Sequence, residues 1–290
     1  MLTATGITVE TGTHHYVLSR LGLLLQEKKY QSMMIVAFDV HLPSMMKTPS
    51  FLASTGWKNP DDASKAPFQL GHNTDKTIFG LFAEKPQLVE HFNAALSAVS
   101  DAGVYNAVLE TPWNDIIGRV DSGEVAMVDV GGADGHVLRQ VLELYPDLGG
   151  RFILQDLPDT IAKVSVDLNK RIEVTTHDFF TPQPVKGARV YHYRMIFHDW
   201  PIDDCRRILR NLKPSMKAGY SKLLIGDSVV PESGASLHQS LIDMTMMTIG
   251  AEEKNETQFR ELLTSEGFSI VNIWRSKYAI DSIIEAEMAI

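Results

Sequence analysis

Apolar and polar residues follow two different spacings along the chain, and the change falls near Glu124. Before it, residues 74–99 carry apolar side chains at helical intervals, with an interruption at Pro86. After it, apolar runs such as VAMVDV (125–130) alternate with amphipathic runs such as HVLRQVLELY (136–145). This alternation predicts buried strands joined by helices, and therefore an α/β fold with a mostly parallel sheet and helices on both faces.

The alternation continues to the C-terminus. We expect further strands within residues 151–158, 171–180, 188–197, 222–230 and 269–276 and in the C-terminal run, and helices over residues 202–213, 237–249 and 256–267. In the first 70 residues the pattern differs: a predicted strand pair over 6–12 and 14–22, a helical stretch over 33–46, and a loop or broken helix over 47–70.

The charge balance narrows the classes of partner. A net charge of −9 argues against nucleic acid or an anionic membrane, since both attract basic surfaces. The single cysteine, Cys205, excludes an intrachain disulfide. No run has the pattern of a signal peptide or the length of a membrane span, so we expect a cytoplasmic protein.

Glycines follow the first apolar run of the second half. In an α/β sheet, ligands bind beyond the carboxyl ends of the strands, so the backbone amides of Gly131, Gly132 and Gly135 are expected to face a ligand. Asp129 would lie near an approaching cation or amine. The motif differs from G-x-G-x-x-G, and a plain tight turn is the alternative.

The next strand ends also carry polar or aromatic residues. Asp156 closes the second strand, roughly 20 residues after the glycines, where an acid typically binds ribose hydroxyls; a turn cap is its alternative role. Asp178 and Phe179 follow the third strand and suit the amino group and face of an adenine. These strand ends together predict a bound nucleoside.

A histidine follows the fourth strand. His198 stands before a helix that Pro201 can begin, and its position at the ligand face suits proton abstraction near neutral pH. An isolated histidine at a helix start is more often bonded to backbone. The placement of His198 beside the predicted ligand favours the general base.

Seven runs follow one another along the chain: VDVGGADGH, QDLP, HDFF, HYRMIFHDW, LIGDSVVP, IDMTMM and EEKNETQFRELLTSEGF. In this order they resemble the small-molecule O-methyltransferases of plants and fungi, which use S-adenosylmethionine. The likeness covers residue 70 onward and implies a Rossmann-like methyltransferase fold. It implies a partial winged-helix and helical region for dimerisation and substrate covering over residues 1–110, and a catalytic domain over residues 111–290. Because residues 1–20 resemble only the end of the winged-helix part, we expect a truncated form and a weakened homodimer.

The resemblance also implies roles for individual residues. His198 would be the general base, Asp227 and Glu256 the acids that flank and orient it, and Met246 part of the acceptor pocket. No metal is expected. The predicted cofactor-binding residues are Asp129, Gly131, Gly132, Gly135, Asp156, Asp178, Phe179 and Arg194.

Two departures from the family pattern concern these sites. Ala133 stands where many members carry glycine, and EEKNE replaces a more usual KERTE-like run. The expected reaction is methyl transfer to a hydroxyl of a small secondary metabolite. A phenolic hydroxyl is the expected acceptor. Two alternatives stay open: a dehydratase or pericyclase that binds S-adenosylmethionine without methyl transfer, and a non-catalytic subunit that pairs with a full-length relative.

Overall fold

A computed structural model describes residues 1–101, 105–164 and 169–289. The chain divides into two compact units, one of Met1–Asn59 with Ser64–Val104 and the other of Pro60–Ala63 with Tyr105–Ile290. Within the described residues, no helix is long and apolar enough to cross a membrane.

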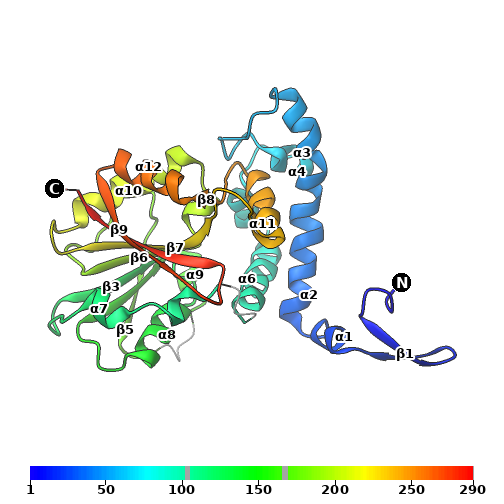
Figure 1. Ribbon diagram of the computed structural model, residues 1–290, viewed down its shortest axis with the longest axis horizontal. Coiled ribbons are helices and arrows are strands. Elements are labelled where there is room, and N and C mark those ends of the chain that lie inside the picture. Colours follow the sequence, from blue (N-terminus) through cyan, green and yellow to red (C-terminus); the bar gives the residue numbers. More distant parts are fainter. Residues whose placement is uncertain (102–104, 165–168, 290) are drawn as a thin grey trace. The chain divides into compact units, whose positions relative to one another are not determined.

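The first unit is helical except for an N-terminal hairpin (Figure 1). The predicted strand pair is confirmed as β1 and β2, which pair antiparallel. A nearly continuous helical run follows through α2, η1 and α3, and α2 packs against α6. The elements are β1 (Thr8–Gly12), β2 (His15–Leu18), α1 (Arg20–Leu24), α2 (Lys28–Ile35), η1 (Val36–His41), α3 (Leu42–Ser54), α4 (Pro67–His72), α5 (Ile78–Glu84) and α6 (Pro86–Asp101).

Two prolines lie in this helical run. The π-helix η1 ends at His41, two residues before Pro43, which has no N–H to donate to the carbonyl of Asp39. The helix α3 then extends to Ser54 with Pro49 inside it, beyond the residue at which we expected a loop. The start of α3 packs against α4, where Gly71 leaves no room for a Cβ beside the backbone of Pro43.

The second unit is the predicted α/β sheet, confirmed as mainly parallel. Among the described residues it has eight strands, in the order β5-β4-β3-β6-β7-β10-β9, with β8 paired to β7. Strands β5 to β7 are parallel, and β10 runs antiparallel to both of its neighbours. The strands are β3 (Val125–Val130), β4 (Arg151–Asp156), β5 (Ile172–Thr176), β6 (Val190–Arg194), β7 (Lys222–Val230), β8 (Lys254–Asn255), β9 (Phe268–Arg275) and β10 (Asp281–Met288).

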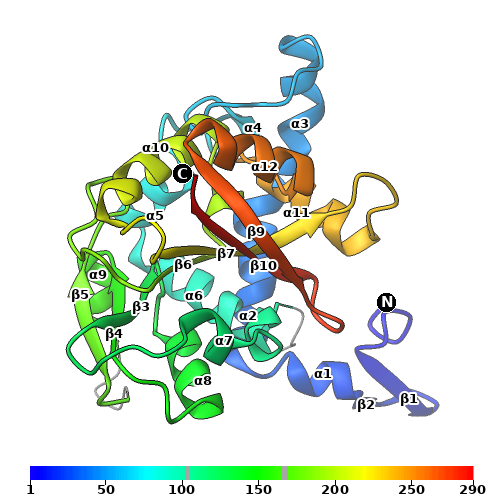
Figure 2. The same cartoon turned by 60° about the vertical axis from the view of Figure 1, so that its left-hand side comes forward.

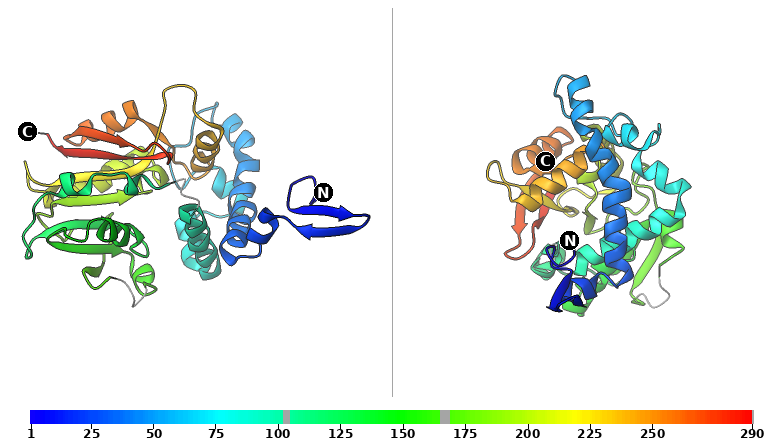
Figure 3. Two further views of the ribbon diagram at one scale, coloured as in Figure 1. Left: turned by 60° about the horizontal axis from the view of Figure 1, so that its bottom comes forward. Right: turned by 90° about the vertical axis from the view of Figure 1, so that its right-hand side faces the viewer.

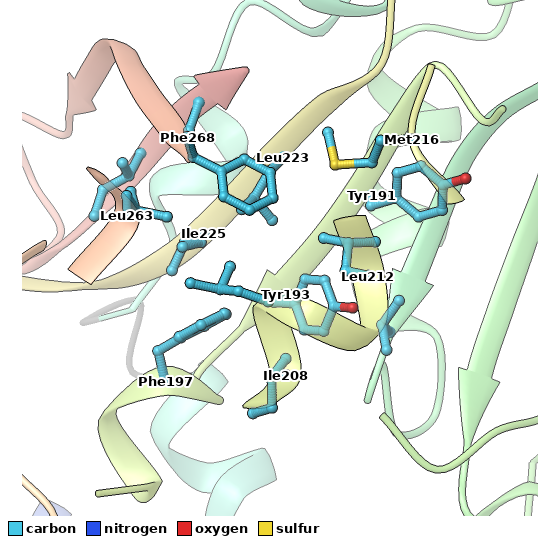
Figure 4. Close-up of a cluster of buried hydrophobic side chains, with 14 of the residues drawn as sticks. Tyr191, Tyr193, Phe197, Ile208, Leu212, Met216, Leu223, Ile225, Leu263 and Phe268 are labelled. Carbon is cyan, nitrogen blue, oxygen red and sulfur yellow. The ribbon is translucent and has the colours of Figure 1, made fainter. Parts of the chain in front are cut away.

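Helices cover both faces of this sheet (Figures 1 and 2). Because successive strand residues point to opposite faces, Leu223 and Ile225 enter one core while Leu224 enters the other. The first core packs against α10 and α12 (Figure 4), and the second against α7 and α8. The helices of this unit are η2 (Ala107–Leu109), α7 (Trp113–Ile117), α8 (His136–Leu144), α9 (Pro158–Ile161), η3 (Phe197–Asp199), α10 (Ile202–Leu212), η4 (Lys213–Ser215), α11 (Leu237–Met247) and α12 (Glu256–Ser265).

The strand order sets the position of the site. From β3 the chain proceeds to β4 and β5 on one side, and then returns to β6 on the other side of β3. In the left view of Figure 3, the strands of this sheet lie roughly horizontal. The carboxyl ends of β3 and β6 therefore flank the point where the connections diverge, which is where open α/β sheets bind their ligands.

Candidate active site

The loop that follows β3, residues 131–135, is called the glycine loop, and hydrogen bonds attach it to the neighbouring strand β4. The amides of Gly131 and Gly132 donate to the carbonyl of Gln155 at 2.8 and 3.1 Å, and the amide of Ala133 donates to Asp156 Oδ2 at 2.9 Å. The expectation that these amides face a ligand is therefore wrong for Gly131 and Gly132, because β4 already uses them.

The conformation and packing of the loop require glycine at two positions. Gly131 has a φ of +71°, and a Cβ there would lie 2.8 Å from Ile196 Cδ1 and 3.7 Å from the ring of Phe179. Gly135 has a φ of +75° and is the N-cap of α8. Both positions have a positive φ that favours glycine, and at Gly131 the side chain of Ile196 leaves no space for a Cβ.

The position of Asp129 also differs from the prediction. Its Oδ1 lies 2.8 Å from His192 Nδ1, and both side chains are buried. A Cβ on Gly132 would lie 2.5 Å from Asp129 Oδ2, so this carboxylate is beneath the loop. Asp129 is thus placed to support the loop rather than to touch a ligand above it.

Asp156 lies at the end of β4, as predicted, and is only partly buried. Besides the amide of Ala133, it accepts a hydrogen bond from the amide of Leu157 at 2.7 Å. The carboxylate therefore performs the turn-capping role and also fixes the glycine loop. The side chain of Thr160 also donates to this carboxylate. Since an ionised carboxylate has about four acceptor positions, one is left for a further donor such as a ribose hydroxyl. Burial raises the pKa of Asp156, against these hydrogen bonds.

Aromatic rings gather at the ends of β5 and β6. The ring of Phe179 makes edge contacts with Phe180 and Trp200, at centroid distances of 5.0 and 6.2 Å. Asp178 is exposed and accepts from the amide of Phe180 at 2.9 Å. These groups offer an apolar face and an acceptor, as an adenine requires.

Arg194 ends β6, and its guanidinium is engaged in several contacts. It donates to the carbonyl of Tyr105 at 2.5 Å, lies 3.2 Å from His136 Nε2, and its Nε is 3.8 Å from Asp281 Oδ2. The Tyr105 side chain is buried, and its hydroxyl has no partner among the described residues. Nothing in the sequence pattern had marked Tyr105.

His198 lies in η3 with carboxylates on two sides. Its Nδ1 is 2.8 Å from Glu253 Oε1, and its Nε2 is 3.4 Å from Asp199 Oδ1. Burial alone would lower the pKa of His198, but the charges of Asp199, Glu253 and Asp227 outweigh it and raise this pKa to about 10. In the free protein, the imidazole is therefore protonated at neutral pH.

Glu256 does not take the position predicted for it. Its carboxylate is on the surface, 2.6 Å from Arg260 Nη2 and 2.7 Å from Arg275 Nη2. The acid beside His198 is Glu253, three residues earlier. The reason is local: Asn255 and Gln258 form a capping box, so that α12 begins at Glu256 and turns this side chain outward. The Asn-x-x-Gln spacing was a signal for this in the sequence.

Asp227 lies on β7 and interacts electrostatically with His198. It is buried, and its carboxyl oxygens have no hydrogen-bond partner within the described part of the chain. Burial raises its pKa to about 7, although protonated His198 opposes this. Asp227 therefore lies in the acidic cluster around His198. Its ionisation costs more free energy than that of an exposed aspartate.

A buried lysine neutralises part of this cluster. Lys254 is fully buried, and its ammonium donates to the carbonyls of Phe197 at 3.0 Å and Glu252 at 3.2 Å. Its charge lowers the pKa values of Asp199 and Asp227, against the larger effect of burial. Charged groups in EEKNE were noted in the sequence, but their burial could not be read from it.

The helix α11 contributes to the same region. Met246 is mostly buried, and Asp243 on this helix accepts a hydrogen bond from the amide of Glu253 at 3.0 Å. A contact of Met246 with an acceptor stays a prediction. Together, the ring of Phe179 and the carboxylates of Asp156 and Asp178 suit a nucleoside, and His198 offers acid–base chemistry.

The chain is similar to proteins of known family. A family model described as the O-methyltransferase domain matches residues 63–269. The O-methyltransferase mfmE of Annulohypoxylon moriforme is 37% identical over 256 residues, which are 87% of this chain and 62% of that protein. The chain thus spans less than two thirds of the length of this relative.

Several solved structures of other proteins match this structure over almost the whole chain. OxaC in complex with S-adenosylhomocysteine and oxaline is 31% identical with a TM-score of 0.90, covering 99% of this chain and 73% of that one. A single-residue variant of LepI in complex with S-adenosylhomocysteine and a substrate analogue is 29% identical with a TM-score of 0.91, covering 99% and 74%. A structure described as a pericyclic reaction enzyme is 27% identical with a TM-score of 0.88, again covering 99% and 74%.

Proposed function

Because this chain belongs to the O-methyltransferase domain family, we propose that it transfers the methyl group of S-adenosylmethionine, its cofactor, to a hydroxyl of a small molecule, with His198 as general base. The observation that carries this proposal is the pairing of His198 with Glu253, in the connection that follows β6, the strand paired with β3. An aromatic acceptor with a phenolic hydroxyl suits it best, because a neighbouring base makes a phenol a good nucleophile at neutral pH.

The cofactor supplies a methyl group on a positively charged sulfur, which a nucleophile can attack directly. Asp156 suits the ribose hydroxyls, and Asp178 and Phe179 suit the adenine. Such positioning contributes to the rate by holding two reactants in line.

The hydrogen bond to Glu253 orients His198. A carboxylate beside Nδ1 keeps the proton on that nitrogen, so that the lone pair of the neutral ring is on Nε2. Nε2 can then take the proton of the acceptor hydroxyl. Glu253 and Asp227 stabilise the imidazolium that forms, since both lie within electrostatic range of the ring.

His198 must lose its own proton before it can act as a base. A positive charge bound nearby lowers the pKa of an imidazole by repulsion. We therefore expect the neutral form of His198 when S-adenosylmethionine is bound, and the protonated form when the neutral product S-adenosylhomocysteine is bound.

The test uses S-adenosylmethionine with a deuterated methyl group and a panel of phenols, together with metabolite extracts of the source organism. Mass spectrometry should find a product that carries the labelled methyl group, in equal amount to S-adenosylhomocysteine. If no acceptor gains the label, the proposal is wrong.

A second candidate function is a rearrangement or dehydration without methyl transfer, supported by the structural likeness to the pericyclic reaction enzyme. In that case an acceptor would change its structure while S-adenosylmethionine is left intact. The same mass-spectrometric assay separates the two functions, because only methyl transfer produces S-adenosylhomocysteine.

A further inference from the structure

A buried hydrogen-bonded pair of side chains, Asp129 and His192, joins the two strands that flank the cofactor site. Asp129 on β3 and His192 on β6 are direct partners in the register of these parallel strands. The glycine loop begins two residues after Asp129, and Arg194 is two residues after His192. The pair therefore lies at the point where the connections of the sheet diverge.

The pair is enclosed by protein. Asp129 Oδ1 and His192 Nδ1 are 2.8 Å apart, and the two side chains are 1% and 0% exposed. The edge of Trp113 packs against the imidazole, at a centroid distance of 5.8 Å and an interplanar angle of 80°. Among the described residues, neither Asp129 Oδ2 nor His192 Nε2 has a hydrogen-bond partner, so each residue depends on the other.

The free oxygen of Asp129 supports the glycine loop. A Cβ on Gly132 would lie 2.5 Å from Oδ2 and 2.7 Å from Cγ, so the backbone of Gly132 lies directly on the carboxylate. A rotation of Asp129 would therefore displace Gly132 and, with it, Gly131. His192 provides the hydrogen bond that opposes this rotation.

We propose that His192 is a positioning residue for cofactor binding: its bond to Asp129 fixes the carboxylate on which the glycine loop lies. The proposal depends on the cofactor and not on which reaction follows. It therefore survives if methyl transfer is replaced by the rearrangement, and its test needs no acceptor.

Stability and positioning respond differently when such a pair is changed. Removal of one partner leaves a buried charge without compensation and strongly destabilises the fold, whereas removal of the charge as well recovers much of the stability. If the pair only stabilises the sheet, cofactor affinity should follow stability. If it positions the loop, affinity should stay low after stability has recovered.

The experiment measures S-adenosylhomocysteine affinity by calorimetry and stability by urea unfolding. His192→Phe should weaken binding by roughly 10- to 100-fold, as expected when a hydrogen bond to a charged group is lost. His192→Asn, which keeps a donor near the position of Nδ1, should recover most of the affinity. In the double variant Asp129→Asn with His192→Phe, stability should rise again while affinity stays low.

Val190→Ala is the matched control, since Val190 is buried two residues earlier on β6 and on the same face of the sheet. It should lose stability and keep the wild-type affinity. The proposal is overturned if His192→Phe binds S-adenosylhomocysteine like wild type, or if affinity follows stability through the whole series.

Discussion

At the level of single residues, the imidazole of His198 is surrounded by more carboxylates than are needed to orient its ring. Glu253 alone would fix the tautomer of His198, yet Asp199 and Asp227 add further negative charge around the buried ring. The excess keeps His198 protonated in the free protein. The buried ammonium of Lys254 limits this excess and donates a hydrogen bond to the carbonyl of Phe197, the residue before His198.

Glu253 and Glu256 provide a matched pair for testing which acid orients the base. Glu253→Gln removes the charge that faces His198 Nδ1, so turnover should fall, by about 10-fold or more if a charged hydrogen bond is lost. Glu256→Gln removes a surface charge that pairs with arginines, and turnover should stay unchanged. Steady-state rates with the identified acceptor check this. A larger loss in Glu256→Gln would contradict the assignment.

The raised pKa of His198 predicts a proton linked to cofactor binding. Because this pKa is about 10 in the free protein, the ring carries its proton at slightly alkaline pH. The positive sulfur of S-adenosylmethionine should lower the pKa and release the proton, whereas neutral S-adenosylhomocysteine should not. Calorimetry in two buffers with different ionisation enthalpies counts the protons. His198→Gln should abolish the difference between the two ligands, and an equal release by both in wild type would contradict the account.

Among the helices and strands, the predictions from sequence succeeded where burial dictates the spacing of apolar residues along the element. The buried runs 125–130 and 222–230 and the helix after the glycines are as predicted, because buried strands must be apolar and α8 must place one face on the sheet. The prediction failed at Glu256, where a helix cap and not the acidic character decides the direction of the side chain. It also failed for the amides of Gly131 and Gly132, because a contact from the adjacent strand cannot be read from one segment alone.

The glycine loop contains a strained position that can be tested. Ala133 has a φ of +51°, a left-handed conformation that costs an L-residue about 1–2 kcal/mol. Glycine removes this cost but adds roughly 0.5–1 kcal/mol of backbone entropy in the unfolded chain. Ala133→Gly should therefore raise the free energy of unfolding slightly, as measured by urea unfolding, and keep the bond from residue 133 to Asp156.

Gly131→Ala in the same loop is the opposite case. It adds a Cβ at a positive φ, 2.8 Å from Ile196, and should lower both stability and S-adenosylhomocysteine affinity. A destabilised Ala133→Gly, or a Gly131→Ala that behaves like wild type, would show that the strain is not as described.

At the scale of the whole molecule, the first unit carries apolar side chains that it does not bury. Along its long helical run, exposed apolar residues recur at every fourth position: Met34, Phe38, Leu42 and Met46. Large exposed apolar patches usually mark an interaction surface. We predict a homodimer formed through this run.

Sedimentation of the purified chain tests this prediction. Wild type should sediment as a dimer, and Phe38→Glu should sediment as a monomer, because a charge in an apolar interface is costly to desolvate. Leu144→Glu is the control, since Leu144 is also exposed but lies in the second unit. A wild-type monomer that stays in solution and is active would contradict the prediction.

The central claim is that His198 performs chemistry and does not bind the cofactor. The most direct measurement compares the rate of methyl transfer and the affinity for S-adenosylhomocysteine in wild type and His198→Ala. The account predicts that turnover at neutral pH falls about 10²–10⁴-fold while affinity stays the same, since general bases typically contribute that much and Asp156, Asp178 and the glycine loop are intact. Higher pH should partly restore the rate on a phenol, because the phenolate then forms without a base. Full methyl-transfer rates in His198→Ala at neutral pH would contradict the account.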